Sequence, residues 1–200
     1  MNWKQQNGVL RRRSRIWALA FSLALGEAAH GQSRAIDTAK SAITVHVYKA
    51  GVLSAFGHDH EIIAPMDRGS VDVEGRKVEL HVNAGALRVG DPKVSDKDRG
   101  EIQTTMLGSD VLDAEKHKEI SFHSTSADAA GAGAWKVTGE LTLHGVTRPV
   151  SMEVRERDGH YAGSCRFKIT DFGIKPVKVA GGTVRVKDEV QIQFDIQLAR

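Results

Sequence analysis

A pair of alternating segments around a His-Gly dipeptide constrains the fold of this chain more than any other feature. In residues 139–154, Leu141 and Leu143 fall on one face of an extended chain, and the polar residues next to them fall on the other. Gly145 stands where the chain must reverse, and the same alternation resumes after it. A period of two on both sides of a short turn predicts a β-hairpin with one buried face.

The same period recurs along most of the chain. Turn residues such as Glu74-Gly75 and Asp158-Gly159 separate the alternating segments. Many short strands at close spacing are typical of an antiparallel sandwich or a closed barrel. We therefore predict an all-β fold, an antiparallel barrel of about eight strands. The alternating segments are residues 43–49, 70–73, 78–82, 120–126, 135–143, 146–155, 161–169 and 190–198.

One segment, residues 91–118, is polar and favours a helix instead. Ser95 and Asp98 have the spacing of a capping box at a helix N-terminus. Ile102 and Met106 lie four residues apart, and would share one face of a helix. We expect one or two short helices here, covering an end of the barrel as a plug or lid.

The first 31 residues have the pattern of a secretory signal peptide. Five basic residues precede an apolar run at 16–25, and small residues follow, including Ala29 and Gly31. The run has about ten residues, whereas a membrane-spanning helix needs about twenty. We predict cleavage before Gln32 and one exported domain at 32–200, with an uncleaved anchor as the alternative.

This leader changes the meaning of the charge balance. The chain has 28 Lys and Arg against 25 Asp and Glu, but residues 1–31 hold five of the basic residues and one acidic residue. The remaining domain therefore carries 23 basic and 24 acidic residues. With no net positive charge and no basic helix, nucleic acid is not an expected partner.

Cys165, the one cysteine, falls in an alternating segment. It has no second cysteine for an internal disulfide, so the domain must be stable through its core. We expect a buried, inert thiol, with copper ligation or a disulfide to a second chain as alternatives.

His58 and His60 form the sharpest chemical signal. On an extended chain both would project from the same face, with Asp59 on the other. Two imidazoles so placed can bind a metal such as copper or zinc if a third ligand comes from elsewhere. They can equally meet a ligand headgroup. The candidates for a third ligand are His46, His81, His123, His144, His160 and Cys165.

Signals for catalysis are weak. No serine or cysteine stands in a Gly-x-Ser-x-Gly elbow. His144 is best interpreted as a turn residue, and Asp110 and Asp113 as solvated carboxylates rather than an acid–base pair. We predict a binding protein and not an enzyme.

Three blocks resemble the YceI-like family: residues 141–150 (Leu-Thr-Leu-His-Gly-Val-Thr-Arg-Pro-Val), 171–174 (Asp-Phe-Gly-Ile) and 186–192 (Val-Lys-Asp-Glu-Val-Gln-Ile). Phe56-Gly57-His58 and residues 98–122 are also similar, so the resemblance covers about 37–199. It implies a lipocalin-like barrel in the periplasm, with an elongated apolar cavity for a polyisoprenoid or another long amphiphile. It is also consistent with a homodimer. The polar His58–Glu61 segment departs from the family's pattern.

Together, these expectations predict that the protein carries a long-chain amphiphile, with no cofactor and no stable insertion into the membrane. His58 and His60 would meet the headgroup. The alternative is a periplasmic stress protein that binds copper or zinc through His58 and His60. Alternation alone does not say which face of each strand points inward. The side chains assigned to the cavity are Val45, Val47, Leu141, Leu143, Phe167 and Phe194.

Overall fold

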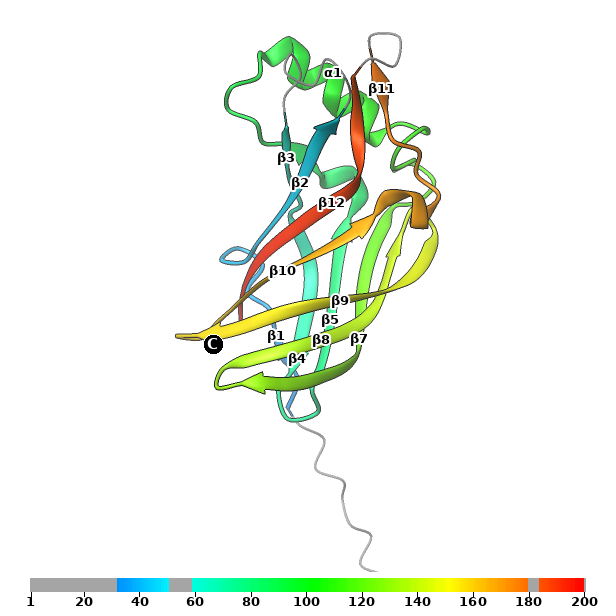
Figure 1. Cartoon of the computed structure of the whole chain (residues 1–200). Helices are drawn as coiled ribbons and strands as arrows, with labels where there is room; N and C mark the ends of the chain where they lie inside the picture. Colours follow the sequence, from blue (N-terminus) through cyan, green and yellow to red (C-terminus); the bar gives the residue numbers. More distant parts are fainter. Residues whose placement is uncertain (1–31, 51–58, 180–183, 200) are drawn as a thin grey trace, which may run out of the picture.

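The computed structural model describes residues 32–50, 59–179 and 184–199. They form one curled, antiparallel sheet with an α-helix at one end (Figure 1). The strand order is β1-β4-β5-β7-β8-β9-β10-β12-β2-β3-β6, and β11 pairs with β12. The predicted all-β, lipocalin-like barrel is confirmed, although the sheet has twelve strands rather than about eight. The predicted leader, residues 1–31, lies outside the described residues.

The difference in strand number comes from four short strands. The long strands are β2 (Ala42–Ala50), β4 (Met66–Asp72), β5 (Lys77–Asn83), β7 (Glu119–Gly131), β8 (Ala134–Leu143), β9 (Val146–Arg157), β10 (His160–Lys168) and β12 (Val184–Gln197). These eight match the eight predicted segments. The short strands are β1 (Arg34–Ala35), β3 (His60–Ile63), β6 (Arg88–Val89) and β11 (Lys178–Val179). With two to four residues each, they are too short to show a period of two.

The hairpin predicted at residues 139–154 is formed by β8 and β9. Leu143 pairs with Val146 across the turn, and the Thr142 and Thr147 hydroxyls are 2.9 Å apart on the outer face. His144 and Gly145 both have positive φ, at 52° and 73°. Two successive left-handed residues match the right-handed twist of a hairpin, which explains a His-Gly turn here.

The predicted helix is α1 (Asp96–Leu107). Ser95 caps it, since its hydroxyl accepts a hydrogen bond from the Asp98 N–H at 3.1 Å. Ile102 and Met106 pack against the barrel core, and Figure 1 shows α1 across one end of the barrel. Two 3₁₀ turns, η2 (Ala84–Ala86) and η3 (Ile169–Phe172), follow β5 and β10 along the chain. No helix within the described ranges is long and apolar enough to cross a membrane.

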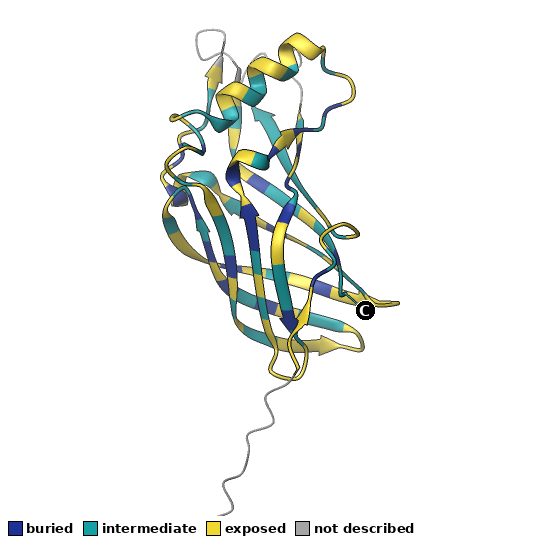
Figure 2. Cartoon of the chain, turned by 180° about the vertical axis from the view of Figure 1, so that it is seen from behind, coloured by how far each residue is buried: buried dark blue, intermediate teal, exposed yellow. Residues whose placement is uncertain are grey.

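Residues 35–37, before β2, link β4 and β12, two strands that are distant in the sheet order. The Ile36 N–H donates to Gly69 of β4, and the Asp37 N–H donates to Gln197 of β12. The Ala199 N–H donates back to Ala35. Ile36 is itself buried. This segment therefore connects β4 to β12 and closes that part of the barrel wall. Figure 2 shows buried and exposed residues alternating along the long strands.

Candidate functional site

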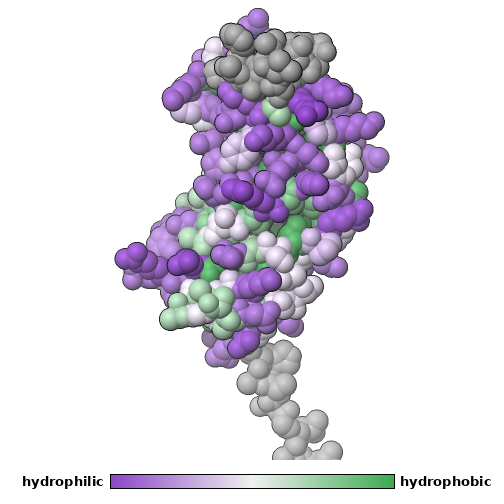
Figure 3. Space-filling model, viewed as in Figure 1, coloured by the Kyte–Doolittle hydropathy of each residue, from purple (hydrophilic) through white to green (hydrophobic). Residues whose placement is uncertain are grey.

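A cavity of about 840 Å³ lies inside the barrel. Its wall is the inward face of the long strands together with Ile102 and Met106 of α1, and it is mostly apolar. Figure 3 shows hydrophobic side chains between hydrophilic ones on one face of the molecule. Apolar residues of the wall include Ile43, Val78, Leu80, Val82, Ile120, Phe122, Trp135, Val137, Val150, Met152, Val154, Val190 and Ile192.

The structure places all six side chains assigned to the cavity on its wall: Val45, Val47, Leu141, Leu143, Phe167 and Phe194. Alternation along β8 explains the pattern. Gly139, Leu141 and Leu143 are buried, whereas Glu140, which points to the other face, is exposed. The tertiary structure thus decides the face that the sequence left open. That these residues bind a ligand stays a prediction.

His60 lines the same cavity at β3 and is held there by a buried carboxylate. Its Nδ1 lies 2.7 Å from Asp91 Oδ2, and the Glu61 N–H donates to Asp91 Oδ1 at 2.7 Å. Asp91 is only 5% exposed. The sequence did not reveal Asp91 as the partner of His60, because Asp91 lies thirty-one positions further along the chain, just after β6. His58 lies outside the described residues, so the His58–His60 metal pair stays a prediction.

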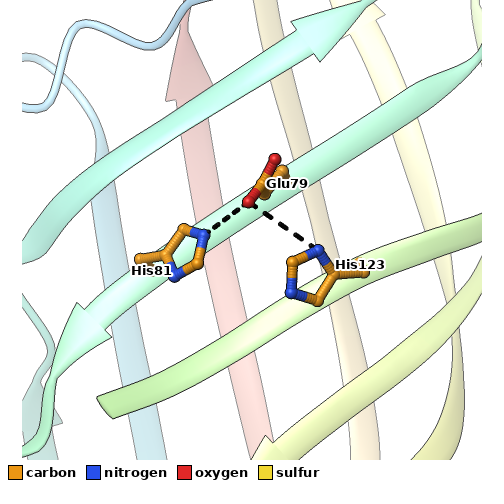
Figure 4. Close-up of side chains that lie close together, drawn as sticks. All are labelled: Glu79, His81 and His123. Atoms are coloured by element: carbon orange, nitrogen blue, oxygen red, sulfur yellow. Dashed lines mark hydrogen bonds and ion pairs between the residues drawn. The ribbon is translucent and has the colours of Figure 1, made fainter.

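Two histidines proposed as third metal ligands come together on the outer face of β5 and β7. His81 Nε2 lies 2.7 Å from Glu79 Oε1, and His123 Nδ1 lies 3.9 Å from the same oxygen (Figure 4). On its other side, His81 Nδ1 is 3.0 Å from Arg68 and 3.1 Å from Glu119. His81 is 7% exposed.

Glu79, His81, His123, Arg68 and Glu119 form an outer network in which the charged groups pair with one another. The hydrogen bond with His81 holds the pKa of Glu79 below its usual value, and the Arg68 guanidinium does the same for the pKa of Glu119. A bound cation would have to displace these contacts and sit close to Arg68. We therefore interpret the outer network as a structural ion-pair cluster on the barrel wall.

A second cluster joins His144 to two residues that were not considered as its partners, Asp113 and His117. All three are partly buried. No sequence pattern predicts the grouping, because the segment before β7 and the β8–β9 turn meet only in the folded barrel.

Cys165 is buried on the cavity wall. Burial among apolar side chains raises the pKa of its thiol from 9.0 to about 11, since the thiolate would lose its hydration. It belongs to neither cluster of candidate metal ligands in the described part of the chain. The arrangement matches a buried, unreactive thiol.

We expect Cys165 to react with a thiol reagent at pH 8 about a hundredfold more slowly in the folded protein than in urea, from its lower thiolate fraction alone. A raised pKa also means that its contribution to stability is complete below pH 9 and is lost as the pH rises towards about 11. Urea unfolding of wild type and Cys165→Ala at pH 8 and pH 10.5 measures this loss. Equal rates of labelling in the folded and unfolded chain would contradict the burial.

A curled antiparallel barrel around an apolar cavity defines a protein of the lipocalin-like class. Within that class, the family model for the YceI-like domain matches residues 35–198, and the chain belongs to this family.

Relatives match most of the chain, and one solved structure shares its fold. A UPF0312 protein of Vibrio parahaemolyticus is 29% identical over 188 residues, covering 88% of this chain and 93% of that protein. A UPF0312 protein of Shewanella denitrificans is 30% identical over 169 residues, covering 78% and 84%. The crystal structure of Burkholderia cenocepacia BcnA matches with a TM-score of 0.61 at 20% identity, covering 82% of this chain and 99% of that one. At this identity the likeness concerns the fold.

Proposed function

We propose that this protein is an exported, periplasmic binding protein that sequesters or carries a long-chain amphiphile, most simply a polyisoprenoid. The observation that carries the proposal is the apolar cavity of about 840 Å³ inside the barrel. Cavities that hold small ligands have volumes of about 300–1,000 Å³. Each methylene of a ligand buried there contributes about 0.8 kcal/mol. Binding of this kind needs no covalent chemistry and no cofactor.

Polar groups of the wall support an amphiphile rather than a plain hydrocarbon. At the α1 end, His60, Lys49, Lys175 and Arg185 line the cavity together with Glu101, and the Asp91 carboxylate is paired with His60. An excess of cationic side chains at this end favours a headgroup that is anionic or accepts hydrogen bonds. The apolar tail would lie along the strands, and the headgroup would meet His60, with His58 expected nearby.

The pattern of the first 31 residues supports export, and the family supports the periplasm. A mixed charge balance in residues 32–200 argues against nucleic acid as a partner. We propose that the protein acts as a monomer or homodimer, as a binding protein and not as an enzyme. Binding of copper or zinc through His58 and His60 is the other candidate.

Native mass spectrometry of the mature protein, purified from an exporting host with and without chelator, tests these functions. We expect an adduct that resists the chelator and releases a lipid on denaturation. An adduct of metal mass that the chelator removes, with no lipid released, would contradict the carrier. It would favour a metal-binding function, and replacement of His60 by Ala would test the predicted pair.

A further inference from the structure

Three potential metal ligands meet near one end of the barrel, outside the groups assigned to the amphiphile. Asp113, His117 and His144 each offer one ligand atom, and these atoms all lie within 4.8 Å of one another. The first two belong to the connection between α1 and β7, and the third to the β8–β9 turn. Neither Asp113 nor His117 lines the cavity.

Backbone hydrogen bonds fix Asp113 and His117 in one turn of chain. The N–H groups of Lys116 and His117 donate to the Asp113 carbonyl at 3.0 and 2.8 Å, and the Asp113 N–H donates to Gly108 at 2.8 Å. The hydrogen bond from the His117 N–H to the Asp113 carbonyl closes one turn, and the positive φ of 45° at Asp113 shows that this turn is not part of a helix. The turn holds both side chains close enough for their ligand atoms to belong to one cluster with His144.

His144 is oriented by a contact with the backbone. Its Nδ1 lies 3.3 Å from the carbonyl oxygen of Phe172, a fully buried residue at the end of η3. When Nδ1–H donates to this oxygen, Nε2 keeps its lone pair. Histidine ligands of metals commonly donate their second N–H to a carbonyl or a carboxylate in this way.

Gly145 makes the approach of His117 possible. A Cβ added to Gly145 would lie 2.6 Å from Cε1 and 2.7 Å from Nδ1 of the His117 ring. Because glycine has no Cβ, the His117 ring can pack against the turn, where it meets the His144 ring edge-on with the centroids 4.7 Å apart. The His144-Gly145 pair therefore has two roles: it closes the hairpin, and it allows the His117 and His144 rings to come together.

The ligand atoms of this cluster are available, unlike those of the outer network. Among the described residues, the Asp113 carboxylate and the His117 ring nitrogens have no hydrogen bond or ion pair, and no Arg or Lys pairs with the cluster. In the outer network, by contrast, Arg68 contacts His81 directly. A partly buried carboxylate beside two imidazoles is stabilised by a cation between them.

We propose that Asp113, His117 and His144 bind a divalent zinc ion that ties the α1–β7 connection to the β8–β9 turn and, through Phe172, to η3. Two imidazoles and one carboxylate are a usual zinc set, with water in the fourth position. Ligand atoms about 2.1 Å from a tetrahedral ion stand about 3.4 Å apart, so small side-chain rotations complete the site. The proposal is independent of the cavity ligand.

Isothermal titration of untagged, chelator-stripped mature protein with Zn²⁺ tests the site. We expect one equivalent to bind to wild type. Asp113→Asn and His117→Gln should each weaken binding by at least about tenfold. Asparagine tolerates the positive φ of 45° at position 113, so the first variant keeps the turn. The matched control is His123→Gln, which removes a histidine of the outer network and should bind zinc as wild type does.

A thermal readout separates binding from folding. Zinc at a hundredfold excess over its Kd should raise the Tm of wild type and His123→Gln by about 5 °C or more, and that of Asp113→Asn by much less. Absence of stoichiometric zinc in wild type would overturn the proposal. So would binding that survives in Asp113→Asn and His117→Gln but is lost in His123→Gln. Circular dichroism confirms that each variant is folded before titration.

Discussion

Replacing Phe172 by Ala should lower the free energy of unfolding by about 3–5 kcal/mol, because it leaves a large void in a packed core. Phe172 is 0% exposed, and its ring packs edge-on against Phe167, with the centroids 5.1 Å apart. A domain of this kind has only about 5–15 kcal/mol of stability in total. Urea unfolding followed by circular dichroism measures the change.

The matched control is Ile63→Ala on β3, which truncates an aliphatic side chain that is 42% exposed. Its effect should stay within about 0.5 kcal/mol. A loss below about 1 kcal/mol for Phe172→Ala would mean that the core can collapse into the space. It would also show that η3 anchors the barrel end less than its burial indicates.

Replacing Val45 by Trp should weaken binding of the proposed amphiphile about fiftyfold. Val45 faces the cavity from β2, and an indole there occupies the volume of about three methylenes of the ligand, worth about 2.4 kcal/mol. Tryptophan is well tolerated in strands, so the sheet should be kept. The measurement is the amount of lipid that co-purifies per protein, followed by a Kd for the lipid identified.

Thr44→Trp is the control for this variant, since Thr44 precedes Val45 on β2 and does not line the cavity. It should retain the ligand of the wild type. If both variants bind lipid equally well, the ligand does not occupy the cavity beside Val45. If both lose it while remaining folded, the loss does not come from the volume of the cavity.

The strands could be predicted because their pattern is local. Each of the eight long strands places apolar side chains on one face and polar ones on the other, and this period is visible within a few residues. Ser95 capped α1 as expected because a cap depends on residues three apart. The short strands β1 and β6 could not be predicted in this way. Their pairing is imposed by β4 and β3, not by any pattern of their own.

The apolar part of the candidate site was also within reach of the sequence, but its polar part was not. Val45, Leu141 and Phe194 follow from alternation once the inward face is known. The partner of His60 is different, because Asp91 reaches it only when β6 pairs with β3. The contact of His117 with His144 likewise depends on the closed barrel.

By itself the sequence determined the fold class, the family, the long strands, the helix and the supply of apolar side chains for a cavity. These depend on periodicity and on motifs, both of which are local. Only the tertiary structure decided which face of each strand lines the cavity, since a shift of one residue in register would exchange the two faces. It alone also brought Asp113 and His117 to His144. Contacts between distant segments are set by strand pairing and barrel closure, and no local pattern encodes them.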